Sequence, residues 1–257
     1  MDVEDRIALV TGGAGGLGLA SARRLAADGL RVVIGDLDGG AAEQAAADLP
    51  GQGHVGVGFD VSDEDGVISA FGRIEAQLGP IAVLANFAGV LRGGTGDFSL
   101  SGLTLREWDR VFAINSTGAF LVTREMARRR AQTPVAHGRI VLVSSAGAQI
   151  GGYQGSAAYF ASKGAVLTLV KAAARELAGQ QITVNGIAPG PIDTAMLRAA
   201  TAARGGDESG YTGMSRVPLA RIGTPEEVAA ATAYLVCRDS AFVTGTMMDV
   251  NGGLRMQ

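Results

Sequence analysis

The chain has 257 residues, of which 47% are hydrophobic and 18% are charged, and this suits one α/β domain over residues 1–257. A net charge of -3 leaves no basic field for gripping a phosphate backbone, so we expect no nucleic-acid partner. The acidic start and the lack of an uncharged apolar run of spanning length predict no signal peptide, no membrane partner and a cytoplasmic location.

Short apolar runs rich in Val and Ile alternate along the chain with Ala-rich segments of helical spacing, a pattern typical of βαβ units. Seven runs are predicted as strands: Ile7 to Val10, Arg31 to Gly35, Gly53 to Asp60, Ile81 to Asn86, Arg139 to Ser144, Ile182 to Ala188 and Gly245 to Val250. Helices are predicted to begin near Gly18, Gly40, Asp63, Thr104, Ala157 and Thr224. The expected class is therefore α/β, with a mostly parallel sheet.

Two segments break this rhythm. Residues 91–103 and 196–217 are rich in Gly, Ser and Ala, have weak periodicity, and each follows the carboxyl end of a predicted strand. Ligands of open α/β sheets bind at that edge. We therefore expect both segments to be loops that cover a substrate, the main substrate loop spanning about residues 195–217.

A glycine-rich turn follows the first predicted strand directly and precedes a helix. Its sequence, Thr11-Gly-Gly-Ala-Gly-Gly-Leu-Gly18, fits two spacings, Gly-x-Gly-x-x-Gly and Thr-Gly-x-x-x-Gly-x-Gly. Glycines let the backbone approach a pyrophosphate, whose charge the free N–H groups and the helix dipole stabilise. The turn predicts a dinucleotide site, with Gly12, Gly16, Leu17 and Gly18 as the candidate contacts.

An acidic residue, Asp36, follows the second predicted strand about twenty residues beyond the turn. A carboxylate there accepts hydrogen bonds from the ribose hydroxyls of an adenosine and repels a 2′-phosphate. No Arg or Lys lies within the glycine turn or directly after Asp36. We therefore predict NAD as the cofactor rather than NADP, the alternative being that Asp36 or Asp38 merely faces solvent.

Tyr159 and Lys163 are four residues apart in a predicted helix, so they share one face. A phenol with a pKa near 10 is a poor base at neutral pH. An ammonium about 4 Å away contributes roughly 4 kcal/mol, or about three pKa units. Lys163 is therefore expected to bring the pKa of Tyr159 toward neutrality, although an ordinary surface pair has the same spacing.

Six motifs in this order, spanning about residues 5–253, resemble the short-chain dehydrogenase/reductase family. They are the glycine turn, Asn86-Phe-Ala-Gly89, Trp108 to Gly118, Ile140 to Ser145, Tyr159 to Lys163, and Val184 to Thr194. The resemblance implies a single-domain, Rossmann-type fold: a doubly wound, seven-stranded, mostly parallel sheet with helices on both faces. Phe87 departs from the family pattern, which has a second asparagine there.

The resemblance also assigns roles to residues. Ser145 would orient the substrate oxygen, with Ser144 as the alternative, and Asn115 would hold a water in a proton relay from Lys163. Thirteen residues separate Ser145 from Tyr159 where the family has twelve, so we expect one added residue between Gly147 and Gly152. The remaining implied cofactor contacts are Asp60, Val61, Asn86, Ala88, Gly89, Pro189, Gly190, Ile192 and Thr194, together with Tyr159 and Lys163.

We therefore expect an NAD(H)-dependent oxidoreductase that interconverts a secondary alcohol and a ketone by hydride transfer. Its expected partner is a small-molecule substrate, and its expected assembly is a homotetramer. A 3-hydroxyacyl or 3-oxoacyl thioester, a steroid and a cyclic alcohol all fit. The alternatives are a cofactor-binding sensor or non-catalytic subunit of the same fold, and an epimerase or dehydratase that recycles NAD.

Other residues are expected to be structural. No zinc-ligand spacing includes His54 or His137, so we expect no metal. The basic run Arg124 to Arg130 is expected to be a solvated helix face. Cys237 is expected to be a buried thiol.

Overall fold

All seven predicted strands are present in the computed structural model, which describes residues 6–92, 99–152, 156–202 and 213–256. The strands are β1 (Ile7–Thr11), β2 (Arg31–Asp36), β3 (Val55–Gly58), β4 (Ile81–Asn86), β5 (Arg139–Val143), β6 (Thr183–Pro189) and β7 (Met247–Val250). They form one sheet in the order β3-β2-β1-β4-β5-β6-β7, and every neighbouring pair is parallel. The expected mostly parallel sheet is thus entirely parallel.

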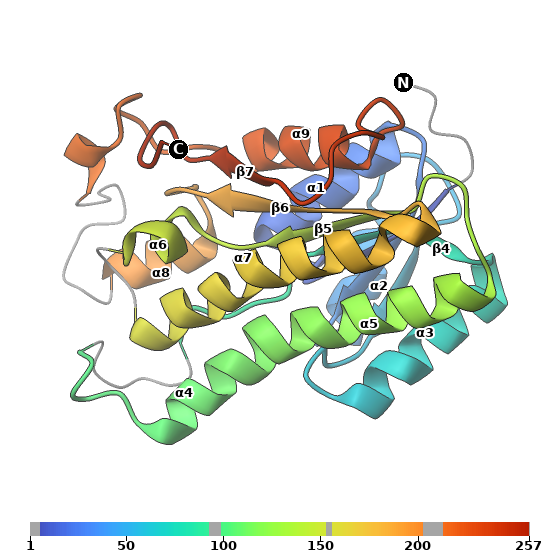
Figure 1. Ribbon diagram of the computed structural model, residues 1–257, viewed down its shortest axis with the longest axis horizontal. Helices are drawn as coiled ribbons and strands as arrows, with labels where there is room; N and C mark the ends of the chain where they lie inside the picture. Colours follow the sequence, from blue (N-terminus) through green and yellow to red (C-terminus); the bar gives the residue numbers. More distant parts are fainter. Residues whose placement is uncertain (1–5, 93–98, 153–155, 203–212, 257) are drawn as a thin grey trace.

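Helices cover both faces of this sheet (Figure 1). They are α1 (Gly16–Ala27), α2 (Gly39–Ala47), α3 (Glu64–Leu78), α4 (Leu105–Phe112), α5 (Gly118–Gln132), α6 (Ala146–Ile150), α7 (Ala157–Leu177), α8 (Ala195–Ala202) and α9 (Pro225–Val236). Three shorter turns are the π-helical η1 (Ala113–Thr117) and the 3-10 helices η2 (Ala178–Gln180) and η3 (Met214–Arg216).

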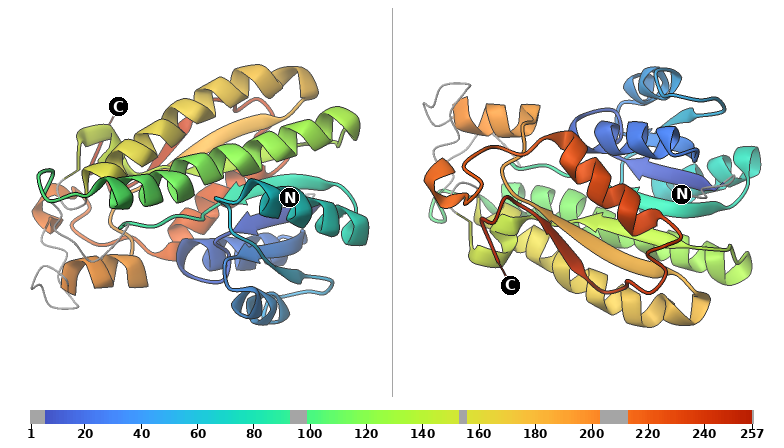
Figure 2. Two further views of the ribbon diagram at one scale, coloured as in Figure 1. Left: turned by 90° about the horizontal axis from the view of Figure 1, so that it is seen from below. Right: turned by 90° about the horizontal axis from the view of Figure 1, so that it is seen from above.

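The two helical layers bury separate cores. Helices α3, α5 and α7 pack on one face, where Phe71, Met126 and Val170 are fully buried. Helices α1, α2 and α9 pack on the other face, around Leu25 and Leu235. Figure 2 shows the two layers from opposite sides. Because both faces are covered, the central strands are buried along their whole length and are mainly apolar, as the Val- and Ile-rich runs predicted.

Two of the helices were not predicted. Helix α8 occupies the start of the segment 196–217 that we expected to be a loop, so that expectation is wrong for residues 195–202. Thr194 accepts a hydrogen bond from the Leu197 N–H (3.3 Å), and the Ala, Met, Leu and Arg residues that follow favour a helix. Residues 93–98 and 203–212 of the expected loops lie outside the described residues.

Helix α6 lies where one residue is added relative to the family pattern. Ser145 is its N-cap and accepts a hydrogen bond from the Gly147 N–H (3.1 Å). The helix ends at Gly151, whose φ of 79° is left-handed and favours glycine. The local order is therefore a short helix from residue 146 to residue 150.

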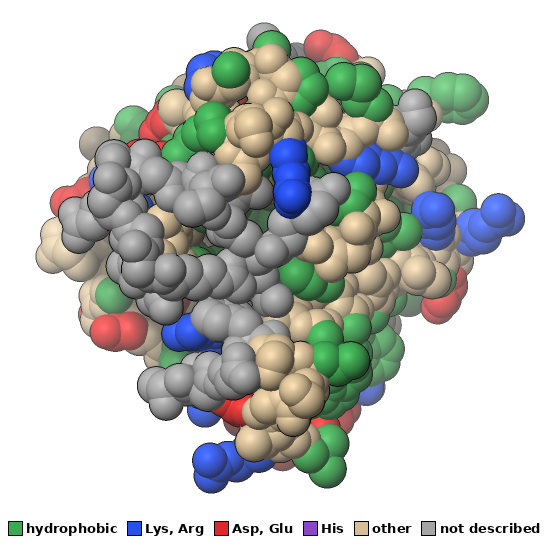
Figure 3. Space-filling model, turned by 90° about the vertical axis from the view of Figure 1, so that its left-hand side faces the viewer, with side chains coloured by type: hydrophobic (Ala, Val, Ile, Leu, Met, Phe, Trp, Pro, Cys, Tyr) green, Lys and Arg blue, Asp and Glu red, His purple; other side chains and the backbone are tan. Residues whose placement is uncertain are grey.

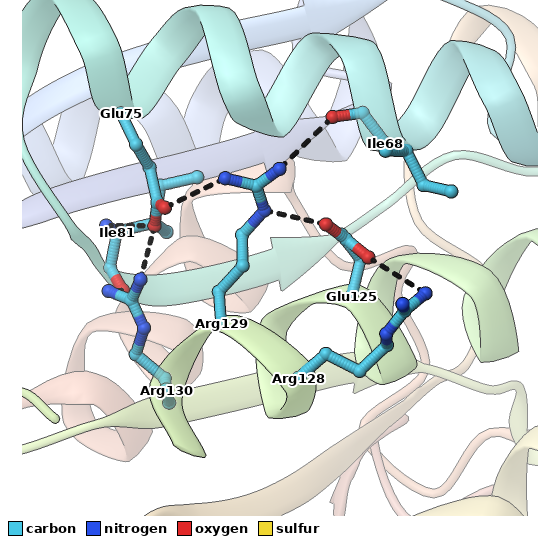
Figure 4. Close-up of polar contacts among 7 residues, drawn as sticks. All are labelled: Ile68, Glu75, Ile81, Glu125, Arg128, Arg129 and Arg130. Carbon is cyan, nitrogen blue, oxygen red and sulfur yellow. Dashed lines mark hydrogen bonds and ion pairs between the residues drawn. The ribbon is translucent and has the colours of Figure 1, made fainter. Parts of the chain in front are cut away.

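The expectation that the basic run Arg124 to Arg130 is a solvated face is wrong for Arg129 and Arg130, whereas the side chain of Arg128 is 61% exposed (Figure 4). Glu75 of α3 forms ion pairs with Arg129 (3.1 Å) and with Arg130, whose side chain is only 1% exposed. Arg129 also pairs with Glu125 (2.6 Å). Arg129 and Arg130 of α5 thus both pair with Glu75 of α3. The spacing of residues within one helix does not reveal such a neighbour on another helix.

Glu75 and Arg130 also hold the backbone where β4 begins. Glu75 accepts a hydrogen bond from the Ile81 N–H (3.1 Å), and Arg130 donates to the Ile81 carbonyl (2.8 Å). One ion pair thereby joins α3, α5 and the first residue of β4. We call this arrangement the Glu75–Arg130 clamp.

Replacing Glu75 with Ala should lower the free energy of unfolding by about 3–5 kcal/mol, because it leaves the buried Arg130 guanidinium without a counter-charge. Denaturant unfolding measures the loss. The control is Arg24→Ala, which breaks the more exposed Arg24–Asp28 pair and should cost less than about 1 kcal/mol. Equal losses in the two variants would contradict the structural importance of the clamp.

Candidate active site

The candidate site lies at the edge of the sheet where the strands end, and Figure 3 looks onto this edge. Two adjoining hollows open there. The first, which we call the groove, is lined by Gly12, Gly15 to Gly18, Asp36, Leu37, Asp60, Val61, Ala88, Gly89 and Thr194, among others. The second, the inner pocket, is lined by Ser145, Tyr159, Lys163, Pro189, Gly190, Ile192, Thr194 and several apolar residues.

The glycine turn forms one wall of the groove. Gly12 has a φ of 63°, and a Cβ on it would lie 2.7 Å from the Ala88 nitrogen, while a Cβ on Gly18 would lie 2.1 Å from the Gly12 oxygen. Only glycine fits these two positions. No side chain caps α1 at Gly15, so the first N–H groups of this helix are available to an anion. The turn therefore fits the pyrophosphate of a dinucleotide.

Acidic residues lie farther along the groove. Asp36 ends β2, and its Oδ2 accepts a hydrogen bond from the Ala14 N–H (3.1 Å), which ties it to the glycine turn. Asp60 follows β3 and accepts hydrogen bonds from the N–H (2.8 Å) and the hydroxyl (2.7 Å) of Ser62. Both carboxylates keep further acceptor capacity toward the groove.

Asn86 does not line either hollow. It is buried at the end of β4, where its Oδ1 accepts a hydrogen bond from the Thr11 hydroxyl (2.5 Å). The asparagine thus joins the ends of β1 and β4 behind the groove, while Ala88 and Gly89 form the groove wall. Of the expected cofactor contacts, Asn86 is the one that the structure places behind the surface.

Tyr159 and Lys163 lie in the first two turns of α7, next to the end of β5. Ser156 caps this helix by accepting a hydrogen bond from the Tyr159 N–H (3.2 Å). The Lys163 ammonium donates to the Val143 carbonyl (2.8 Å). The Tyr159 hydroxyl is hydrogen-bonded to the Ser145 side chain. The structure therefore brings these three sequence-predicted residues together.

The two adjacent serines differ in their surroundings. Ser144 is buried, and its hydroxyl donates to the Lys163 carbonyl oxygen (2.7 Å), which fastens α7 to β5. Ser145 is half-buried, caps α6 and faces Tyr159. Its hydroxyl is the one that can reach a molecule in the inner pocket together with the phenol.

Burial controls the electrostatics of this pair. Desolvation raises the pKa of Tyr159 above 10, and the hydrogen bond from Ser145 opposes that rise without cancelling it. Burial also lowers the pKa of Lys163 to about 8. The pKa shift of Tyr159 is therefore opposite in direction to the expected shift toward neutrality, because desolvation by burial is its largest cause.

Asn115 lies in the π-helical turn η1 and is fully buried. Its Oδ1 accepts a hydrogen bond from the Val90 N–H (2.8 Å), and its Nδ2 donates to the Val90 carbonyl (2.9 Å) and to the Ser162 hydroxyl (3.0 Å). A Cβ on Gly89 would lie 3.1 Å from Asn115 Oδ1 and 3.2 Å from Lys163 Nζ, so the two side chains meet at this glycine. The proton relay through Asn115 stays a prediction.

Part of the apolar wall of the inner pocket was not predicted, although Met196 and Leu197 belong to the segment that was expected to cover the substrate. Ile150, Phe160, Met196, Leu197 and Leu254 contribute to it. Phe160 and Leu197 lie on helices beside predicted site residues, but Leu254 follows the last strand and carries no motif signal. The inner pocket is thus lined mainly by apolar side chains where the structure describes it.

Two residues that were expected to be structural, His54 and Cys237, lie away from the site described above. His54 accepts a hydrogen bond from the Val32 N–H (3.0 Å) and contacts the Pro50 carbonyl (2.9 Å). Cys237 is buried, as expected. Within the described ranges, no three His, Cys, Asp or Glu side chains gather as metal ligands do, and no helix is long and apolar enough to cross a membrane.

Lys163 gives a pH test of its burial. A lysine whose pKa falls from 10.5 to about 8 on folding destabilises the folded state below pH 8, and this penalty disappears as the pH rises toward 10.5. Between pH 7.5 and 9.5 the wild type should gain about 2 kcal/mol of stability relative to Lys163→Met. Urea unfolding at the two pH values measures this difference. An identical pH response in the two proteins would mean that Lys163 is solvated.

Comparisons with known proteins agree with this geometry. A family model described as enoyl-(acyl carrier protein) reductase matches residues 12–255. The 3-oxoacyl-[acyl-carrier-protein] reductase FabG of Escherichia coli is 35% identical, with 100% of each chain covered. The acetoacetyl-CoA reductase of Allochromatium vinosum is 36% identical, covering 98% of this chain and 99% of the relative.

A solved structure supports the same relationship. The crystal structure of gox2181 superposes with a TM-score of 0.90 at 30% identity, covering 97% of this chain and 95% of that one. Family model, relatives and fold agree over nearly the whole chain. The chain therefore belongs to the short-chain dehydrogenase/reductase family, whose members are oxidoreductases that use a nicotinamide cofactor.

Proposed function

We propose that the protein is an NAD(H)-dependent reductase that interconverts a ketone and a secondary alcohol, with 3-oxoacyl and 3-hydroxyacyl thioesters as its substrate class. The observation that carries the proposal is the hydrogen-bonded pair of Tyr159 and Ser145, in a pocket that adjoins the groove. A phenol and an alcohol that share a hydrogen bond can both reach one substrate oxygen.

In this proposal Tyr159 donates its proton to the carbonyl oxygen during reduction, and Ser145 orients that oxygen by a second hydrogen bond. A bound nicotinamide supplies the hydride in reduction and accepts it in oxidation. The raised pKa keeps the Tyr159 phenol protonated at neutral pH, which favours its role as a proton donor.

Lys163 and Asn115 have supporting roles in the proposal. Lys163, held at the Val143 carbonyl, lies against Gly89 of the groove wall and would contact the nicotinamide ribose. With a pKa of about 8 it can release and regain a proton near neutral pH, and so return the proton that Tyr159 gives up. Asn115 fixes the Val90 backbone beside it and would pass that proton toward solvent through water.

The rest of the proposed cofactor site follows the groove. Gly12, Gly16, Leu17 and Gly18 would hold the pyrophosphate, with Thr194 facing them across the groove. Asp36 would bind the adenine ribose, and Asp60, Val61, Ala88 and Gly89 would flank the adenosine. Pro189, Gly190 and Ile192 would meet the nicotinamide end beside Tyr159 and Lys163. Asn86 would support this site through Thr11.

The thioester class rests on the relatives and on the pocket. Two relatives are named as reductases of a 3-oxoacyl-[acyl-carrier-protein] and of acetoacetyl-CoA, and these two substrates share a ketone two bonds from a thioester carbon. The inner pocket offers apolar side chains to an acyl group. The segment of residues 195–217 remains our proposed cover of this pocket, with α8 as its first part.

Replacing Tyr159 with Phe should lower kcat for acetoacetyl-CoA reduction by about 10²–10⁴-fold while the Kd of NADH stays within about twofold, because only the proton donor is removed. Stopped-flow absorbance and cofactor fluorescence measure the two quantities. Loss of NADH binding instead would make Tyr159 structural. Any turnover by the wild type excludes the alternative of a non-catalytic sensor.

The two serines provide a matched comparison. Ser145→Ala should lower kcat by about 10²-fold, because a donor to the substrate oxygen is lost. Ser144→Ala should instead lower the unfolding free energy by about 1 kcal/mol through the lost Lys163 contact, with a smaller effect on kcat. The reverse pattern in steady-state rates and thermal unfolding would move the role to Ser144.

The proposed preference for NAD rests on the carboxylates of Asp36 and Asp38, which would face a 2′-phosphate with like charge. The wild type should bind NADH at least tenfold more tightly than NADPH, a difference of about 1.4 kcal/mol. Asp36→Asn keeps an acceptor for the Ala14 N–H and should narrow that ratio. Equal or tighter NADPH binding by the wild type, in a fluorescence titration, would refute the assignment.

The tetramer and the cytoplasmic location expected from the sequence stay predictions. Analytical ultracentrifugation of the purified protein tests the first of them directly.

A further inference from the structure

One wall of the inner pocket is built from two segments that are far apart in sequence. Gly147 and Ile150 come from α6, and Leu254 comes from the turn that follows β7. Neither segment is part of the sheet. A fixed shape of this wall therefore requires contacts that hold α6 and the turn after β7 in place.

Asp249 of β7 contacts both segments. Its Oδ1 accepts a hydrogen bond from Gln149 Nε2 of α6 (3.3 Å), and its Oδ2 accepts from Arg255 Nη1 of the C-terminal turn (2.9 Å). The Arg255 and Asp249 side chains are 25% and 20% exposed, so water screens this pair only partly. The carboxylate of Asp249 on β7 thus links α6 to the C-terminal turn.

The C-terminal turn has its own internal hydrogen bonds. Asn251 accepts from the Gly253 N–H through its side chain (2.9 Å) and from the Leu254 N–H through its backbone (3.2 Å), and its amide donates to the Arg255 carbonyl (3.2 Å). The turn packs directly on the pocket, because a Cβ on Gly190 would lie 2.7 Å from the Asn251 Cα. These contacts carry Leu254 to the pocket wall.

Helix α6 is short and begins at Ser145, so its position and that of the Ser145 hydroxyl are coupled. It lies over Phe160, since a Cβ on Gly147 would be 2.4 Å from that ring. The Gln149 contact is what ties α6 to the sheet at β7. Because Ile150 ends this helix and lines the pocket, a shift of α6 would move the pocket wall.

We propose that Asp249 is a positioning residue that joins α6 and the C-terminal turn into one wall, and that Leu254 on this wall limits the length of the acyl chain the pocket accepts. The inference rests on the proposed function. Leu254 lines the same pocket as Ser145 and Tyr159, so an acyl chain that extends along this wall from the reacting carbon would meet its side chain.

The test uses reduction of three esters that differ only in acyl length: ethyl 3-oxobutanoate, ethyl 3-oxohexanoate and ethyl 3-oxooctanoate. The measured quantity is the ratio of kcat/KM for the longest ester to that for the shortest. Leu254→Ala should raise this ratio about tenfold, because the truncated side chain makes room for further methylene groups. Leu254→Met keeps the volume and should leave the ratio within about twofold.

The role of Asp249 is tested by the arms of the linkage. Gln149→Ala removes the hydrogen bond from α6 to Asp249, and Arg255→Ala removes the ion pair from the C-terminal turn. Asp249→Ala removes both contacts. Each single variant should raise the ratio about threefold or more, with little change in kcat for the shortest ester. Asp249→Ala combined with Arg255→Ala should equal Asp249→Ala alone, because residues acting through one contact are not additive.

Two controls separate positioning from general damage. Arg24→Ala breaks a distant ion pair of α1 and should leave the ratio unchanged. The Kd of NADH should be unchanged in the Gln149, Arg255 and Asp249 variants, because these three residues line neither the groove nor the inner pocket. A variant that unfolds is replaced by its conservative form, Asp249→Asn, which keeps an acceptor for Gln149 and loses only the charge.

The outcomes are distinct. Selective gains for long esters in Leu254→Ala and in the arm variants support the inference. An unchanged ratio in Leu254→Ala, or an equal loss for all three esters in the Asp249 variants, overturns it while the wild type remains active. No reduction of any ester or of acetoacetyl-CoA by the wild type overturns the proposed function, and the inference with it.

Discussion

Two hydrogen bonds of opposite direction between α7 and the end of β5 fix the geometry on which the candidate site depends. Lys163 donates through its ammonium to the Val143 carbonyl, and Ser144 donates through its hydroxyl to the Lys163 carbonyl. Because both ends of each bond are buried, breaking either would leave an unpaired polar group away from water. Tyr159, one turn earlier in α7, and Ser145, one residue beyond Ser144, inherit their relative position from this contact.

Burial sets the chemistry as well as the geometry. The enclosure that fixes Lys163 lowers the pKa of its ammonium, and the same enclosure raises the pKa of the Tyr159 phenol. Both shifts favour the uncharged forms. At pH 7 a lysine with a pKa of about 8 is still mainly protonated, and the enclosed site screens its charge and any charge brought by a ligand only weakly.

Much of the fold could be predicted from the sequence, because its signals are local. Seven apolar runs predicted the seven strands, and the capping box of Thr224 and Glu227 marks the start of α9. The positions that gather around the inner pocket, Ser145, Tyr159 and Lys163, were also found from motifs. The contacts that could not be predicted join residues that are distant in the chain. Arg130 of α5 pairs with Glu75 of α3, and Leu254 lines the pocket because the turn after β7 folds back onto it.

The direction of the Tyr159 pKa shift shows the same limit. Spacing within one helix predicts that Lys163 lies near Tyr159, but the size of each charge depends on desolvation by the whole pocket. Likewise, α6 could not be predicted, because the added residue between Ser145 and Tyr159 says nothing about the conformation it adopts.

The Glu75–Arg130 clamp holds the edge of the sheet where the strands begin, opposite the edge that carries the site. Its two hydrogen bonds to Ile81 hold the start of the central strand β4, independently of the loops at the other edge of the sheet. Segments such as α6 can therefore gain or lose a residue without disturbing the strand register. In evolutionary terms, the locked edge gives this chain the freedom to acquire a new substrate by exchanging loops alone.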